Sequence, residues 1–128
     1  MAVQLNHTIV AAADAETSAR WLAELLGLPE PEPFGHFWQV TAANGLGLDF
    51  ASVGLDPIAS QHYAFLISEE EFDLIFGRVR DRGLQYWADP YRKRPGEISC
   101  NDGGRGIYFE DPDGHFLELL TRPYGSGK

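Results

Sequence analysis

The sequence predicts an α+β fold made of two similar halves, and three observations support this prediction. A strand-like run with a histidine near its start opens each half, at residues 4–10 and 61–67. A pattern typical of a helix follows each run. Each half then closes on the same order of residue types (glycine, two residues, leucine, acid, apolar), at 45–50 and 114–119. We therefore expect a strand, a helix and two or three further strands in each half.

In the first half, Asp14 is placed to cap a helix that runs to about Leu26, with Gly27 at its end. Three prolines in residues 29–33 predict an interrupted segment after this helix. Residues 37–42 and 46–51 then predict a hairpin, because the Asn-Gly pair between them favours a tight turn.

In the second half, Ser68 and Glu71 have the spacing of a capping box, in which each side chain bonds to the other residue's backbone N–H. Apolar residues at helical spacing follow, and Gly83 marks the end of the helix. The expected strands are residues 85–88, 106–110 and 115–121, with an extended loop at 91–104. Cys100 is the only cysteine, which excludes an intrachain disulfide, and we expect it to be buried or half-buried.

Composition limits the possible partners. The 128 residues are enough for one domain, and the formal net charge of −9 opposes binding to nucleic acid. The chain has no apolar run long enough to cross a membrane, and no basic residue precedes the short apolar run near its start. We therefore predict a cytoplasmic protein with a small-molecule partner; the acidic balance would suit a cationic one.

Three polar residues occupy unusual strand positions. His7, His62 and Glu118 each share a strand face with apolar neighbours. A carboxylate on such a face is costly unless it is paired or bound to a metal. Two imidazoles and one carboxylate form a facial triad suited to Fe(II), Mn(II), Ni(II) or Zn(II), and Asp49, the counterpart of Glu118, is a possible fourth ligand. The alternatives are hydrogen-bonded core histidines and a glutamate paired with an arginine.

Motifs in both halves resemble the vicinal oxygen chelate superfamily, also called the glyoxalase/bleomycin resistance/dioxygenase superfamily. They are Leu5-Asn6-His7, Gln61-His62-Tyr63 and the nine residues Asp-Pro-Asp-Gly-His-Phe-Leu-Glu-Leu at 111–119. The resemblance covers almost the whole chain. It implies two βαβββ modules, at about 3–52 and 60–122, that form an open cup-shaped mixed sheet in a single domain, followed by a short flexible tail. It also implies a homodimer, and a metal held by His7, Asp49, His62 and Glu118.

Two functional hypotheses follow. The first is a metal-dependent enzyme whose substrate binds the metal through neighbouring oxygens, with lyase or isomerase, dioxygenase and thiol-transferase chemistry left open. In it, Glu118 or Asp49 would be the base, and Arg105 and Arg122 would hold an anionic group. The second is a non-catalytic protein that sequesters an aromatic or cationic antibiotic. The aromatic residues expected to contact a ligand in either case are Phe34, Phe37, Trp38, Tyr63, Trp87, Tyr91 and Tyr108; core packing is the alternative for Trp38 and Trp87.

Overall fold

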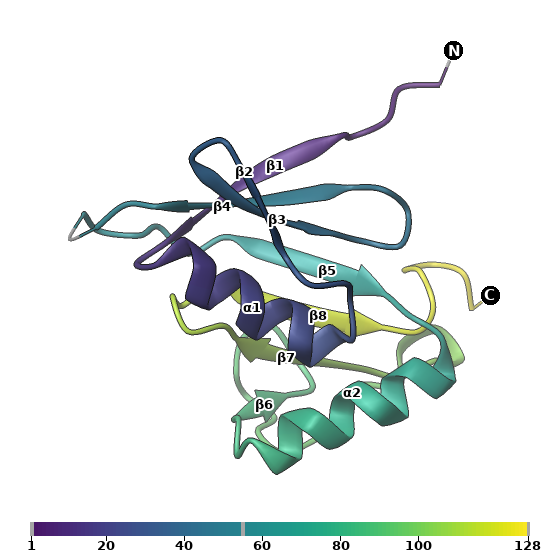
Figure 1. Ribbon diagram of the computed structural model, residues 1–128. Helices are drawn as coiled ribbons and strands as arrows, with labels where there is room; N and C mark the ends of the chain where they lie inside the picture. Colours follow the sequence, from purple (N-terminus) through teal and green to yellow (C-terminus); the bar gives the residue numbers. More distant parts are fainter. Residues whose placement is uncertain (1, 55, 128) are drawn as a thin grey trace. The chain divides into compact units, whose positions relative to one another are not determined.

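The computed structural model describes residues 2–54 and 56–127. It divides the chain into two compact units, Met1–Ala59 and Ser60–Lys128, so that the boundary falls between the two halves of the sequence (Figure 1). Over the described residues each unit has one α-helix and one four-stranded mixed sheet, and neither sheet closes on itself. This confirms the predicted α+β fold class.

The first unit has the element order strand, helix, three strands. Its elements are β1 (His7–Ala12), α1 (Ala15–Leu26), β2 (Glu32–Phe34), β3 (Phe37–Thr41) and β4 (Gly47–Ser52). The strands lie in the order β1-β4-β3-β2, with β1 parallel to β4 and the other pairs antiparallel. The hairpin predicted around Asn44 and Gly45 is confirmed as the β3–β4 connection.

Helix α1 begins and ends as predicted. The Asp14 carboxylate accepts a hydrogen bond from the backbone N–H of Thr17 (3.2 Å), and Gly27 follows the helix in the left-handed conformation with φ = 71°. Its buried face, including Leu22 and Leu25, contacts β3 and β4. The strand residues Val40 and Phe50 are buried as well, which leaves the alternate residues of these strands for the opposite face of the sheet.

The second unit repeats this order and adds one short 3₁₀ helix. The elements are β5 (His62–Leu66), α2 (Glu69–Asp81), β6 (Tyr86–Trp87), η1 (Asn101–Gly103), β7 (Gly106–Glu110) and β8 (Phe116–Leu120). Its strands lie in the order β5-β8-β7-β6, with β5 parallel to β8. Its core is formed by buried residues of α2, among them Phe72, Phe76 and Val79, and of β7 and β8, among them Ile107 and Leu119.

The start of α2 confirms the predicted capping box. The Ser68 hydroxyl accepts from the Glu71 N–H at 3.1 Å, and the Glu71 carboxylate accepts from the Ser68 N–H at 2.8 Å. These reciprocal bonds lower the pKa of Glu71, because they favour its charged form.

Two features differ from the expectations. Strand β2 was not predicted, since prolines dominate its surroundings; Pro33 is tolerated because β2 lies at the edge of the sheet, where an N–H is not required. Cys100 is exposed, so its expected burial is wrong: it directly precedes the loop turn η1 instead of lying in a strand.

Neither described helix is long and apolar enough to cross a membrane.

Candidate metal centre

The second unit brings together two of the predicted ligands. β5 and β8 are parallel neighbours in which His62 pairs with Phe116 and Ala64 with Glu118, so the side chains of His62 and Glu118 project from the same sheet face. Nε2 of His62 lies 3.1 Å from Oε1 of Glu118. The Glu118 side chain is only 4% exposed, whereas that of His62 is 48% exposed. The pair therefore joins a buried carboxylate to an imidazole that solvent or a ligand can reach.

A backbone contact determines which nitrogen of His62 is free. Nδ1 lies 2.9 Å from the carbonyl oxygen of Phe116, and a carbonyl oxygen can only accept a hydrogen bond. Nδ1 must therefore carry the proton. In the neutral ring Nε2 then holds a lone pair, and it faces the Glu118 carboxylate, which also carries lone pairs. A protonated ring would instead donate from Nε2 to Oε1 of Glu118. A histidine that donates one N–H to a backbone carbonyl and turns its other nitrogen to the site is the arrangement found at metal ligands.

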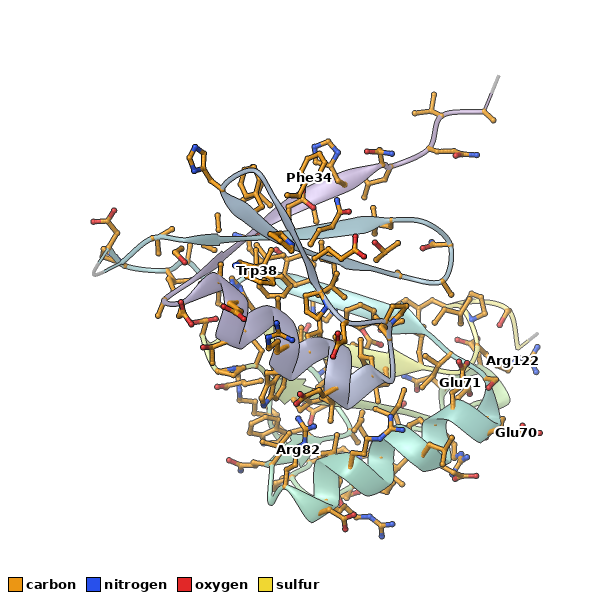
Figure 2. The ribbon with its side chains drawn as sticks, in the orientation of Figure 1. Phe34, Trp38, Glu70, Glu71, Arg82 and Arg122 are labelled. Atoms are coloured by element: carbon orange, nitrogen blue, oxygen red, sulfur yellow. The ribbon has the colours of Figure 1, made fainter. Side chains whose placement is uncertain are left out.

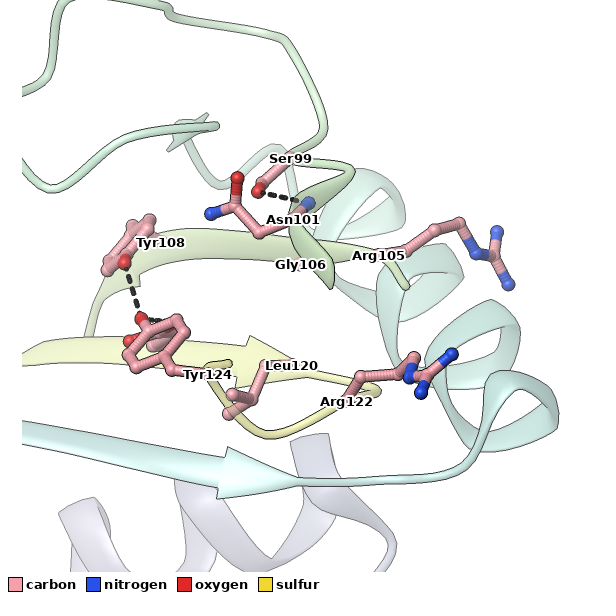
Figure 3. A pocket seen from close by; sticks show the side chains of 9 residues that line it. Ser99, Asn101, Arg105, Gly106, Tyr108, Leu120, Arg122 and Tyr124 are labelled. Carbon is pink, nitrogen blue, oxygen red and sulfur yellow. Dashed lines mark hydrogen bonds between the residues drawn. The ribbon is translucent and has the colours of Figure 1, made fainter. Parts of the chain in front are cut away.

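The second oxygen of Glu118 is bound by a tyrosine pair. The Tyr124 hydroxyl donates to Oε2 of Glu118, and the Tyr108 hydroxyl lies 2.9 Å from the Tyr124 hydroxyl. Burial, followed by the hydrogen bond to Glu118, raises the pKa of Tyr124. Burial also raises the pKa of Tyr108. These two residues line a small pocket together with Glu118, Ser99, Asn101, Arg105, Gly106, Leu120 and Arg122 (Figure 3).

Aromatic rings continue from His62 along the same face. The Tyr108 ring stacks 6.0 Å from His62 and 5.5 Å from Phe116, and Trp87 lies 6.0 Å from Phe116. The guanidinium of Arg92 lies 4.2 Å above the Phe116 ring and 5.2 Å from the Trp87 ring. We call His62, Tyr108, Phe116 and Trp87 the aromatic row. Trp87 and Tyr108 are buried, so the accessible part of the row consists of the exposed His62 ring and the half-buried Phe116 ring.

The first unit holds the other two predicted ligands. His7 is exposed, and its Nδ1 lies 2.7 Å from Oδ1 of Asn6, so that Nε2 is again the nitrogen left free when Asn6 accepts. Asp49 is 3% exposed, and its Oδ1 accepts from Nε2 of Gln39 at 2.7 Å. Gly47 makes room for this pair, because a Cβ there would lie 2.8 Å from Nε2 of Gln39.

The remaining predicted residues fall into three groups. Arg105 forms ion pairs with Glu69 (2.7 Å) and Asp73 (2.9 Å), and Arg122 donates to the Ser126 carbonyl. Trp38 shares its face of β3 with the buried Val40, and Tyr63 shares its sheet face with Leu117. Trp38 lies beside α1 (Figure 2), where it contacts the guanidinium of Arg20. Phe34 and Tyr91 are exposed, and Phe37 lies on the Gln39 face of β3. Of the predicted aromatic contacts, Trp87 and Tyr108 are the two in the aromatic row.

Neither unit has a complete ligand set of its own. Over residues 2–54 and 56–127, no group of three or more His, Cys, Asp or Glu side chains lies close enough to hold a metal ion. His62 and Glu118 thus form an incomplete site, which would need further ligands.

Sequence reasoning missed four residues of these networks. Tyr124 donates a hydrogen bond to Glu118, and Gln39 donates one to Asp49. His115 is 1% exposed and accepts from the Gln61 N–H at its Nδ1. Arg92 covers the aromatic row from the loop after β6. Strand register could have suggested Gln39, which pairs with Asp49, but the sequence has no signal for Tyr124 or Arg92.

Comparison with known proteins defines the family. The model of the Glyoxalase/Bleomycin resistance protein/Dioxygenase superfamily matches residues 4–119. The chain therefore belongs to this superfamily, as its motifs indicated.

Particular relatives narrow the class further. The chain is 62% identical to the solved structure of Oxidase ChaP-H2, with a TM-score of 0.95 and complete coverage of both chains. It is 32% identical over 124 residues to glutathione transferase FosA of Serratia marcescens, covering 93% of this chain and 81% of the relative. It is 25% identical to fosfomycin resistance protein FosX of Listeria monocytogenes complexed with Mn(II) and sulfate, with a TM-score of 0.71 and coverages of 99% and 96%. These relatives support a metal-dependent enzyme of the superfamily.

Proposed function

We propose that the protein is a metal-dependent oxidoreductase that acts on a small aromatic substrate with two neighbouring oxygen atoms. The observation that carries the proposal is the facing pair of His62 Nε2 and Glu118 Oε1, 3.1 Å apart, at one end of the aromatic row. The similarity to an oxidase over the full chain supports oxidation as the reaction type.

The donor set fits a divalent metal ion. Two ligand atoms that are each about 2.1 Å from one ion, at right angles, lie about 3 Å apart, close to the separation of Nε2 and Oε1. Both atoms carry lone pairs when His62 is neutral and Glu118 ionised, so a cation near them would relieve their repulsion. The family resemblance implies His7 as a further ligand, and its Nδ1 contacts a carbonyl-type oxygen as the Nδ1 of His62 does.

Asp49 is less well placed as a ligand. Its carboxylate is buried and accepts from the Gln39 amide, so the role we propose for it is a fixed negative charge on the face of β4 that also carries Gly47. The ion itself would be Fe(II), Mn(II), Ni(II) or Zn(II), with Fe(II) or Mn(II) favoured by a redox reaction and by the Mn(II)-bound FosX relative.

The residues of the second unit would orient the substrate. A bound metal supplies Lewis-acid polarisation of the two substrate oxygens. Within the aromatic row, the exposed His62 ring and the half-buried Phe116 ring are the parts on which a planar substrate would stack. Arg92 borders them, since its guanidinium lies over Phe116 and pairs with Glu110 at 2.8 Å. The Tyr108 hydroxyl contacts the Tyr124 hydroxyl at 2.9 Å, so Tyr108 would act through its ring and not as a hydrogen-bond donor to the substrate.

Dioxygen uptake tests this function. Protein loaded with Fe(II) or Mn(II) is mixed with catechol-type compounds, which present two neighbouring oxygens on an aromatic ring. We expect uptake above the rate of the free metal ion, and a loss of about 100-fold or more in His62→Ala. His36→Ala is the matched control, since His36 is exposed and lies in the turn between β2 and β3; it should keep the wild-type rate.

Two other outcomes would replace the proposal. Conjugation of fosfomycin to glutathione without dioxygen uptake would assign thiol transfer, the activity that the name of the FosA relative indicates. Tight binding of an aromatic antibiotic by metal-free protein, with no turnover of either probe, would assign sequestration.

A further inference from the structure

The C-terminal segment of residues 122–127 is fastened to the second unit by several hydrogen bonds. The Asp102 carboxylate accepts from the backbone N–H groups of Gly125 (3.1 Å) and Gly127 (3.2 Å). The Arg122 guanidinium donates to the Ser126 carbonyl at 3.0 Å, and the Ser126 hydroxyl donates to the Pro123 carbonyl at 2.6 Å. Asp102 itself adopts a left-handed conformation with φ = 58°, which orients its backbone in the turn beside the segment. Asp102 thus ties the segment to the turn before β7 through two backbone N–H groups.

This fastening places the Tyr124 hydroxyl on the Glu118 carboxylate (Figure 3). A tyrosine hydroxyl has one hydrogen, and Tyr124 uses it to donate to Oε2 of Glu118. The 2.9 Å contact between the two hydroxyls must then be a bond donated by Tyr108 and accepted by Tyr124. The protons thus all point the same way, from Tyr108 through Tyr124 to Glu118. In such a chain each bond polarises and strengthens the next.

The two oxygens of Glu118 consequently have different partners. Oε2 is held by Tyr124, while Oε1 faces Nε2 of His62 at 3.1 Å. A carboxylate whose second oxygen is fixed loses less freedom when it binds an ion, and its free oxygen keeps one direction. Partners of this kind behind a metal ligand contribute about 10- to 100-fold to metal affinity in known sites.

We propose that Tyr124 is a positioning residue that holds Glu118 so that the carboxylate meets the metal through Oε1 alone. The inference rests on the proposed metal site of His62 and Glu118. The match to the superfamily model ends at residue 119, before Tyr124 and its anchor at Gly125 and Gly127.

Mn(II) titration of three variants tests the proposal without any need for a substrate. Tyr124→Phe removes only the hydroxyl, and it should weaken Mn(II) binding about 10-fold. Asp102→Gly removes the anchor while keeping the left-handed backbone without strain. It should also weaken Mn(II) binding, but by a smaller factor than Tyr124→Phe, because the untethered segment still reaches Glu118 part of the time. Tyr86→Phe is the control, since this tyrosine packs its ring against Phe76 of α2 and should leave affinity unchanged.

The double variant separates positioning from a general loss of structure. If Asp102 acts through the Tyr124 hydroxyl, then Asp102→Gly combined with Tyr124→Phe should bind Mn(II) as weakly as Tyr124→Phe alone. Thermal unfolding of the metal-free proteins should show both single variants folded. Additive losses in the double variant, or wild-type affinity in Tyr124→Phe, would overturn the role of Tyr124 while leaving the metal site intact. Absence of Mn(II) binding by the wild-type protein would overturn both proposals.

Discussion

One backbone contact gives His62 its chemical role. The Phe116 carbonyl requires a proton on Nδ1, so Nε2 is the nitrogen that faces Glu118. The contact between Nδ1 and this carbonyl follows from strand pairing, because His62 and Phe116 are register partners on β5 and β8. A pair of adjacent strands therefore fixes both the position and the tautomer of one candidate ligand.

In the first unit, a glycine determines whether the Asp49 network can form. A Cβ at Gly47 would lie 2.8 Å from Nε2 of Gln39, which donates to Asp49. We expect Gly47→Ala to lower the free energy of unfolding by about 1–2 kcal/mol, because it displaces Gln39 from a buried carboxylate. Urea denaturation measures this change.

Gly77→Ala is the matched control for that substitution. Gly77 lies within α2 and a Cβ there meets nothing within 4 Å, so alanine should stabilise the protein by about 0.5–1 kcal/mol. Equal effects of the two alanines would contradict the close approach at Gly47.

The site residues that could be predicted from sequence are polar residues that the alternation of strand side chains places on an apolar face. His62 and Glu118 each interrupt an apolar face, and the structure brings them within hydrogen-bond distance. Tyr124 escaped prediction because its contact depends on a chain reversal held by Asp102, for which the local sequence has no periodic pattern. His7 and Asp49 lie in the other unit, and their part in the metal site stays a prediction.

At the scale of elements, the capping box determines where α2 begins. Ser68→Ala removes the acceptor for the Glu71 N–H, and we expect it to lower the free energy of unfolding by about 1 kcal/mol. Chemical denaturation of Ser68→Ala beside Glu70→Ala, which changes an exposed residue of the same helical turn that has no part in the box, measures the difference. A loss no larger than that of Glu70→Ala would contradict the cap.

The same box makes helix stability depend on pH. The pKa of Glu71 is lowered in the folded protein by hydrogen bonds from Ser68, so its contribution is fully present above the unfolded pKa of about 4.3. It is lost as the pH falls through the lower folded pKa. The unfolding free energy of wild type should therefore exceed that of Glu71→Gln by a constant amount from pH 5 to 7, and the gap should close below pH 4.

Glu70→Gln is the control for this pH series, because Glu70 is exposed on the same helical turn and has no part in the box. A gap that stays constant down to pH 3 would show that Glu71 does not titrate as described.

The helix starts were predictable because caps are local in sequence. Strand β2 was not predictable, because its three residues are defined by pairing with β3 and contain a proline.

At the scale of the whole molecule, the repeated element order accounts for how the candidate ligands are distributed. Each unit has a parallel pair made of its first and last strands, β1 with β4 and β5 with β8. In each pair the first strand begins with a histidine and the last carries a buried acid, Asp49 or Glu118. The two units thus place a histidine and an acid at equivalent positions of their parallel strand pairs, and they differ in the residue that holds the acid: Gln39 for Asp49 and Tyr124 for Glu118.

The oligomeric state remains a prediction from the family resemblance. Leu5 (71% exposed) and Ile9 (58% exposed) leave apolar surface beside His7 on the first unit. We expect a homodimer, so light scattering should give twice the chain mass of 14.2 kDa. A mass of one chain at high protein concentration would contradict it.

The central claim is that His62 and Glu118 hold a divalent metal ion, with His7 as a further ligand. The most direct test is calorimetric titration of metal-free protein with Mn(II), comparing wild type with His62→Ala, Glu118→Ala, His7→Ala and the control His36→Ala. We predict one ion per chain for wild type and His36→Ala, and a loss of binding of about 100-fold or more in the other three. Wild-type affinity in either His62→Ala or Glu118→Ala would contradict the claim.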